Sequence, residues 1–143
     1  EIGSYSAVFV PGGHGAMLGI PEDPNVGAVL RWAHENDLFT ISWGHGPGSF
    51  HATAMDGREF LYGGYRMAVF PDSVDKMTPK IGYLPGHMPW RLGEQLSKRG
   101  VTLVNSKADD TCCVHRNLIT GASPLAANEL GKVAVASLLK QLM

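Results

Sequence analysis

Residues 39–47 are Phe39-Thr40-Ile41-Ser42-Trp43-Gly44-His45-Gly46-Pro47, and this stretch indicates the fold of the whole chain. Its apolar first half predicts a buried strand, and the Gly-His-Gly-Pro that follows predicts a sharp turn into a helix. This is the layout of a nucleophile elbow, in which the turn residue points its side chain into a pocket above the sheet. Here the turn residue is Gly44, so the pattern predicts a catalytic turn without an attacking atom.

Strand and helix patterns precede this turn. A short apolar run at residues 5–10 stops at Pro11 and predicts a parallel strand covered on both faces. Residues 24–36 keep the three-and-four spacing of a helix, with Asp23 as its cap and Pro24 in its first turn. Strand, helix and strand within about forty residues form a βαβ unit, which implies a right-handed crossover.

The rest of the chain continues the alternation. We expect a short helix at 48–55, strands at 65–70 and 101–104, a helix at 89–99, a hairpin of 112–114 with 118–120, and a last helix from Ser123 to near Met143. The inward face of the last helix should carry Leu125, Leu130, Val133, Ala134, Ser137 and Leu138. The alternation predicts an α/β sandwich with a mostly parallel sheet.

Composition and charge exclude several classes of protein. The net charge is −1 with 17% charged residues, and no basic cluster supports nucleic-acid binding. No apolar run is long enough for a membrane span, and we expect no signal peptide before the first strand. The opening at Glu1 is expected of a start within a longer protein or of a processed end. The adjacent Cys112 and Cys113 form no disulfide framework, which predicts a reducing cytoplasm.

Ligands collect past the carboxyl ends of strands in open parallel sheets. The first strand is followed by the glycine-rich turn Pro11-Gly12-Gly13-His14-Gly15. Such a turn either needs positive φ angles for its tight geometry or offers free backbone N–H groups as an oxyanion hole. The spacing of its glycines fits neither a dinucleotide fingerprint nor a phosphate loop.

The second strand ends at Gly44 and His45. A cysteine or serine before His45 would make a nucleophile–base pair. Glycine adopts the strained angles of such a turn and supplies no attacking atom. None of the other candidate nucleophiles lies at the predicted tip of the elbow: Ser42, Ser49, Cys112 and Cys113.

A third strand end carries Asp72 and Asp75, either of which could orient His45 as the acid of a triad does. Turn formation and capping are the alternative roles for both aspartates. His87 either lines the same cleft or is a buried structural histidine. His51 is expected to pack or to lie at the surface, and His34 and His115 are expected to be surface residues. No His-x-x-x-His or paired Cys-x-x-Cys occurs, so the chain alone has no obvious metal site.

With these residues in place, the chain resembles the PfpI/DJ-one superfamily of the class I glutamine amidotransferase-like fold. Within it, the chain is similar to the heat-shock chaperone, glyoxalase III and protein deglycase branch. The matching stretches cover nearly the whole chain: residues 8–16, 45–47, 70–76, 78–79, 81–87, 118–121, 123–124 and 126–128.

The resemblance implies a flavodoxin-like three-layer αβα sandwich, usually a homodimer in the cytoplasm. Proteins of this branch convert methylglyoxal to D-lactate without glutathione or any other cofactor, and they are described as deglycases of early glycation adducts. These activities are of the lyase and hydrolase kinds. The branch is also described as stress-inducible holdase chaperones, which implies unfolded protein clients besides a small aldehyde or glycated substrate.

The resemblance also assigns site residues. Gly44 occupies the position of the family's nucleophilic cysteine, the family histidine corresponds to His45, and the supporting aspartate corresponds to Asp75. Oxyanion donors correspond to the backbone around Gly12 and Gly13, and the substrate site is expected to include His14 and His87. Trp43 stands where the family usually has a smaller aliphatic residue.

Part of the family's machinery lies outside this chain. A catalytic glutamate and a reported metal site belong to the first half of the full-length proteins, so residues 1–143 correspond to the C-terminal portion of a single domain. The N-terminal half is therefore an expected partner, and no metal is expected in this chain. Without the cysteine we expect impaired catalysis, and the alternatives are a holdase chaperone or a pseudoenzyme.

Overall fold

Four strands form the central sheet in the order β1-β2-β6-β5. β1 (Ala7–Val10), β2 (Phe39–Trp43) and β6 (Leu118–Gly121) are parallel to one another, and β5 (Cys112–His115) pairs with β6 in the antiparallel sense. The computed structural model describes residues 3–143. The mostly parallel sheet expected from the sequence is confirmed, and so is the hairpin, which turns at Arg116 with a φ of +56°.

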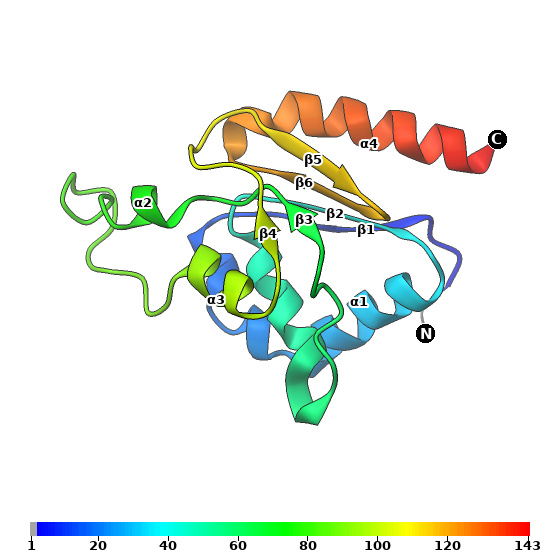
Figure 1. Ribbon diagram of the computed structural model, residues 1–143, viewed down its shortest axis with the longest axis horizontal. Helices are drawn as coiled ribbons and strands as arrows, with labels where there is room; N and C mark the ends of the chain where they lie inside the picture. Colours follow the sequence, from blue (N-terminus) through cyan, green and yellow to red (C-terminus); the bar gives the residue numbers. More distant parts are fainter. Residues whose placement is uncertain (1–2) are drawn as a thin grey trace.

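Helices cover both faces of this sheet (Figure 1). α4 (Ala127–Leu142) lies on one face, against a small core that includes Ile41 and Ile119. α1 (Pro24–Glu35) and the 3₁₀ segment η3 (Gly46–Gly57) lie on the other. The larger core on that side centres on Leu30 and Phe50, both fully buried. The layers therefore form the αβα sandwich that the sequence predicts.

The first crossover helix follows the capping signals in the sequence. The carboxylate of Asp23 accepts hydrogen bonds from the backbone N–H groups of Asn25 at 2.8 Å and Val26 at 3.4 Å. These bonds satisfy donors that the first turn of a helix leaves free. The predicted cap is confirmed, and α1 ends one residue before the predicted boundary.

Two predicted elements on this side are wrong in kind or in extent. The expected helix at 48–55 belongs to the longer 3₁₀ segment η3, which is broken near its end by non-helical angles at Met55 and Asp56. The expected strand at 65–70 is only β3 (Arg66–Met67), paired with β4 (Thr102–Leu103) in a separate two-stranded sheet. Beyond Met67, side chains replace a neighbouring strand as hydrogen-bond partners: Ala68 N–H donates to Thr120 Oγ1, and Val69 N–H donates to Asn105 Oδ1.

The last helix begins later than predicted. Ser123 Oγ accepts the N–H of Leu125 at 3.1 Å, but this cap starts a 3₁₀ turn, η4 (Pro124–Ala126), and α4 begins at Ala127. The 3₁₀ turn rotates Leu125 outward, so the prediction that it faces inward is wrong, and its side chain is 73% exposed. Leu130 and Ala134 are buried as predicted.

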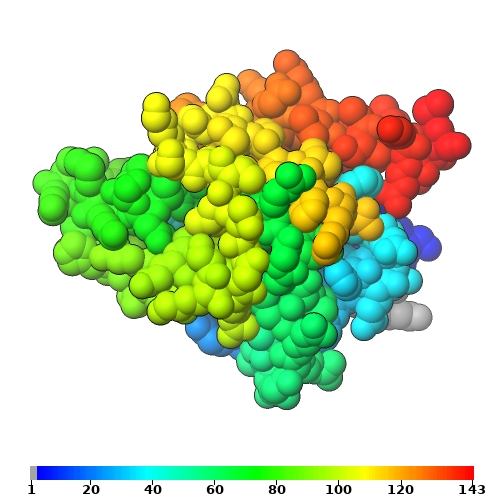
Figure 2. Space-filling view, viewed as in Figure 1, coloured from blue at the N-terminus to red at the C-terminus, as the bar shows by residue number. Residues whose placement is uncertain are grey.

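The remaining segments surround the carboxyl end of the sheet. η1 (His14–Met17) and η2 (Ile20–Glu22) follow β1, and α2 (Asp72–Asp75) follows β3. A long loop connects α2 to α3 (Leu92–Lys98), which is shorter than the predicted 89–99. In the space-filling view, α2 and this loop project from one side of the molecule (Figure 2). No helix in the described part of the chain is both long and apolar enough to cross a membrane.

Candidate active site

The elbow lies where β2 ends. Gly44 has a φ of +57°, in the left-handed region that glycine adopts without a steric penalty. Two backbone bonds hold the turn: Gly44 N–H donates to the carbonyl of Gly121 at 2.9 Å, and the carbonyl of Gly44 accepts the N–H of Phe70 at 3.0 Å. A Cβ placed on Gly44 would meet no heavy atom within 4 Å. The turn therefore leaves space for a side chain at position 44, at a φ that residues other than glycine rarely adopt.

His45 follows Gly44 and is held by an aspartate from another element. Its Nε2 lies 2.7 Å from Asp75 Oδ2, and the two residues are 2% and 4% exposed. Phe70 stacks on the imidazole with ring centroids 4.5 Å apart. An ionised carboxylate only accepts hydrogen bonds, so Nε2 carries a proton, and in the neutral imidazole the lone pair is on Nδ1. This fixed tautomer is the arrangement of a general base.

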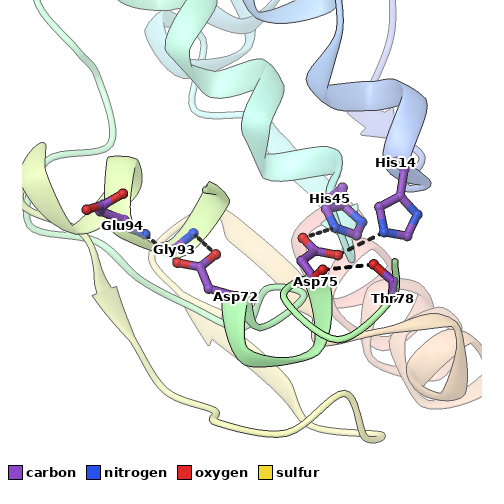
Figure 3. Close-up of polar contacts among 7 residues, drawn as sticks. All are labelled: His14, His45, Asp72, Asp75, Thr78, Gly93 and Glu94. Atoms are coloured by element: carbon purple, nitrogen blue, oxygen red, sulfur yellow. Dashed lines mark hydrogen bonds and ion pairs between the residues drawn. The ribbon is translucent and has the colours of Figure 1, made fainter. Parts of the chain in front are cut away.

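A second imidazole shares the same carboxylate. His14 Nε2 lies 2.8 Å from Asp75 Oδ1, and the rings of His14 and His45 are 4.2 Å apart (Figure 3). Burial raises the pKa of Asp75, but the hydrogen bonds that His45 and His14 donate to its carboxylate outweigh it and lower the pKa overall. The sequence predicts His14 as a substrate residue but contains no local signal for its bond to Asp75. The pairing of β1 with β2 could have indicated it, because the carboxyl ends of parallel neighbours meet.

The two aspartates that the sequence left as alternatives have different partners. Asp72 accepts the backbone N–H groups of Gly93 at 2.8 Å and Glu94 at 2.9 Å (Figure 3), so it caps the first turn of α3. Asp75 faces the histidines, and its own carbonyl accepts the hydroxyl of Thr78 at 2.8 Å. Within the described chain, Asp75 is therefore the acid beside His45, and Asp72 is structural.

A cavity of about 340 Å³ opens over the elbow. No side chain with a permanent charge lines it, and the lining residues are Pro11, Gly12, Gly13, His14, Trp43, Gly44, His45, Phe70, Tyr83 and Pro124. His87 is exposed and is not among them. Tyr83 lines the cavity instead, because its loop folds back against His14. The sequence gives no separate signal for Tyr83.

The glycine-rich turn has both of the properties left open by its sequence. A Cβ on Gly12 would lie 2.5 Å from the carbonyl oxygen of Trp43, and Gly13 has a φ of +104°. Both positions therefore require glycine. In the described chain, the backbone N–H groups of Gly12, Gly13 and His45 have no hydrogen-bond partner. These are donors available to a negatively charged oxygen.

The alternative nucleophiles lie elsewhere. Burial raises the pKa values of Cys112 and Cys113, so both thiols are protonated at neutral pH, and neither lines the cavity. Ser42 Oγ donates to the carbonyl of Val10 at 2.8 Å, and the hydroxyl of Ser49 is buried. None of these groups reaches the tip of the elbow.

The two histidines and the aspartate of the site also form a group that could hold a metal ion, which the sequence does not predict. His14, His45 and Asp75 each offer one ligand atom, and these atoms lie within 4.8 Å of one another. Histidine and carboxylate ligands suit zinc and similar ions. The spacing rule used on the sequence failed because the ligands come from three separate elements.

Comparison with known proteins shows which sequences and folds this chain resembles. No family profile matches the chain. The protein/nucleic acid deglycase HchA of Escherichia coli O1:K1 / APEC and protein/nucleic acid deglycase 1 of Escherichia coli K12 are each 50% identical over 137 residues. These matches cover 94% of this chain and 47% of the relative, so the chain spans about half the length of the curated relatives it matches.

Solved structures share the fold. Glyoxalase III of Candida albicans superposes with a TM-score of 0.72 at 19% identity, covering 92% of this chain and 56% of that protein. The 24 kDa rapid encystment protein of Francisella tularensis gives a TM-score of 0.81 at 20% identity, covering 94% of this chain and 58% of the other.

Fold and site together define a flavodoxin-like α/β protein with a histidine–aspartate pair at an elbow. The chain resembles the deglycase and glyoxalase III branch of the PfpI/DJ-one superfamily, as its sequence predicts, and the half-length matches are consistent with the C-terminal half.

Proposed function

We propose that this chain carries the histidine–aspartate part of a glyoxalase III or deglycase site, for a 2-oxoaldehyde such as methylglyoxal or for an early glycation adduct. The observation that carries the proposal is His45, held by Asp75 at 2.7 Å beside the open position of Gly44. The names of the relatives, protein/nucleic acid deglycases, support a glycation adduct as the substrate.

Each residue has a definite role in this proposal. A thiol at the position of Gly44 would attack the aldehyde carbon, and His45 Nδ1 would take the thiol proton. Asp75 holds the imidazole and stabilises its charged form. The free N–H groups of Gly12 and Gly13 would stabilise the oxygen that becomes negative. This chemistry needs no cofactor. Because Gly44 has no thiol, we expect the chain as it stands to be nearly inactive.

The proposal includes a partner, namely the half of the relatives that this chain does not match. β1 pairs only with β2 among the described strands, and an apolar groove of about 340 Å³ lies beside it. Its lining includes Val8, Val26 and Val29, and Phe9 on the same strand is 54% exposed. Parallel strands are normally covered on both faces and paired at both edges. A further strand and its connecting helix fit this edge.

The same groove favours a second candidate function. A holdase binds unfolded clients through exposed apolar surface and needs no thiol. If the chain acts alone, this surface is available to such clients, and the protein is then a chaperone or pseudoenzyme. A homodimer in the cytoplasm is part of either proposal.

The substitution Gly44→Cys tests the enzymatic proposal. The variant, alone and fused behind the unmatched N-terminal part of HchA, should consume methylglyoxal and release D-lactate, whereas the unchanged chain in both formats should not. The double variant with His45→Gln is the control and should return to background. A Gly44→Cys fusion that stays inactive, while suppressing aggregation of a heat-denatured client, would leave the chaperone as the better description.

A further inference from the structure

The position of the missing nucleophile is an empty space beside an intact base. The cavity of about 340 Å³ reaches Gly44, where a Cβ would touch nothing within 4 Å. Pockets of a few hundred cubic ångströms hold small organic ligands. The lining has no permanently charged side chain. The space therefore favours a small neutral molecule over an ionic one.

The base is poised without any contribution from residue 44. Nε2 of His45 is bound to Asp75, which leaves the lone pair on Nδ1, and the ring lines the cavity. His14 is fixed in the same tautomer by the other oxygen of the carboxylate. Two imidazoles whose neutral forms have the lone pair on Nδ1 thus border one space, near the N–H groups of Gly12 and Gly13, which have no hydrogen-bond partner within residues 3–143.

A free small thiol can supply the sulfur that the chain lacks. Thiols add reversibly to the aldehyde carbon of a 2-oxoaldehyde and form a hemithioacetal, a small neutral molecule with its sulfur already attached. We propose that the cavity over Gly44 binds such hemithioacetals and that His45 isomerises them to thioesters of 2-hydroxy acids. This inference rests on the proposed function, since it takes the same class of aldehyde.

The reaction balances without an oxidant. His45 Nδ1 removes the proton from the carbon that bears sulfur, and the electron pair forms a carbon–carbon double bond to the former carbonyl carbon, giving an enediol. The proton then returns to the former carbonyl carbon. The hydroxyl proton on the carbon that bears sulfur moves to the oxygen of the former carbonyl. The carbon that bears sulfur is thereby oxidised to the level of a carboxylic acid and becomes a thioester, and the ketone carbon is reduced to an alcohol. Unpartnered N–H groups stabilise the enediolate oxygen.

The test mixes the unchanged chain with methylglyoxal and 2-mercaptoethanol, with a chelator present, and follows the ultraviolet absorbance of the thioester. We expect a rate on the order of 100-fold above the thiol and aldehyde without protein. Methylglyoxal deuterated at the aldehyde carbon should react more slowly, because that C–H bond breaks. Glutathione should be several-fold less effective, because its charged groups do not suit this lining.

Two variants decide the outcome. His45→Gln should abolish the thiol-dependent rate, and His51→Gln, outside this cavity, should leave it unchanged. No thiol effect, or an effect that survives His45→Gln or shows no isotope effect, overturns the inference. Gly44→Cys without added thiol reports separately on the proposed function. If this variant is active and the unchanged chain shows no thiol effect, only the present inference is rejected. If this variant is inactive and the unchanged chain shows a thiol effect, only the proposed covalent mechanism is rejected.

Discussion

The imidazole rings of His14 and His45 lie 4.2 Å apart and donate to the two oxygens of one carboxylate, Asp75. The three residues come from η1, the end of β2 and α2, so the carboxylate joins three elements at the carboxyl end of the sheet. A site of this kind contributes to stability as well as to chemistry.

Asp75→Asn should destabilise the chain by about 1–3 kcal/mol, because the amide presents an N–H₂ group to one of the two histidine donors. Urea unfolding at neutral pH measures the loss. Asp72→Asn is the matched control on the same short helix, and it should weaken only the capping of α3, by about 1 kcal/mol. Equal losses in the two variants would contradict the shared-carboxylate arrangement.

The same carboxylate predicts a stability change in acid. The pKa of Asp75 is lower in the folded chain than its ordinary value of 3.8, so its stabilising effect is present above that value. It is lost as the pH falls through the lower, folded pKa. Between pH 5 and about pH 2, the free energy of unfolding should fall more steeply with decreasing pH in the unchanged chain than in Asp75→Asn. Parallel curves would show that Asp75 is not linked to folding.

His51 predicts a second, separate pH dependence. Burial, with the charge of Arg99, lowers its pKa from 6.5 to about 4, and its Nε2 is buried without a partner. Between these values the unfolded chain binds a proton that the folded chain does not, so stability falls as the pH drops from 6.5 toward 4. We expect a loss of about 1–2 kcal/mol, reduced from the full shift because the side chain is partly exposed. His51→Leu should flatten this part of the urea-unfolding profile.

Gly12 and Gly15 form a matched pair of glycines in one turn. A Cβ on Gly12 would lie 2.5 Å from the carbonyl oxygen of Trp43, whereas one on Gly15 meets nothing within 4 Å. Gly12→Ala should cost about 1–3 kcal/mol through backbone displacement, and Gly15→Ala should be nearly neutral. Thermal unfolding of the two variants checks this. A neutral Gly12→Ala would mean that the turn packs less closely on β2 than described.

Local chemistry explains which parts of the fold could be predicted. The Asp23 cap and the βαβ unit were predictable because their signals lie within a few residues of the structure they form. The exposure of Leu125 was not, because one 3₁₀ turn resets the face of the following helix. The strand at 65–70 was over-extended because distant side chains, Thr120 and Asn105, take its backbone bonds.

The site residues likewise divide into those with a local sequence signal and those whose contacts come from distant parts of the chain. His45 was recognisable from its place after a strand, but the choice between Asp72 and Asp75 depends on where α3 packs, since Asp72 caps it from 21 residues earlier in the chain. The bond from His14 to Asp75 spans 61 residues and has no local signal. For His87 the sequence leaves a place in the cleft or a buried structural role, but its side chain is exposed, and the loop brings Tyr83 to the cavity instead.

The backbone bonds of Gly44 to Gly121 and Phe70 hold the turn with no help from a side chain. The turn therefore keeps its shape independently of the side chain at position 44. A single substitution can install a thiol, a hydroxyl or a carboxylate in front of the same imidazole. The chain is thus a ready scaffold on which nucleophiles can be compared against one constant background.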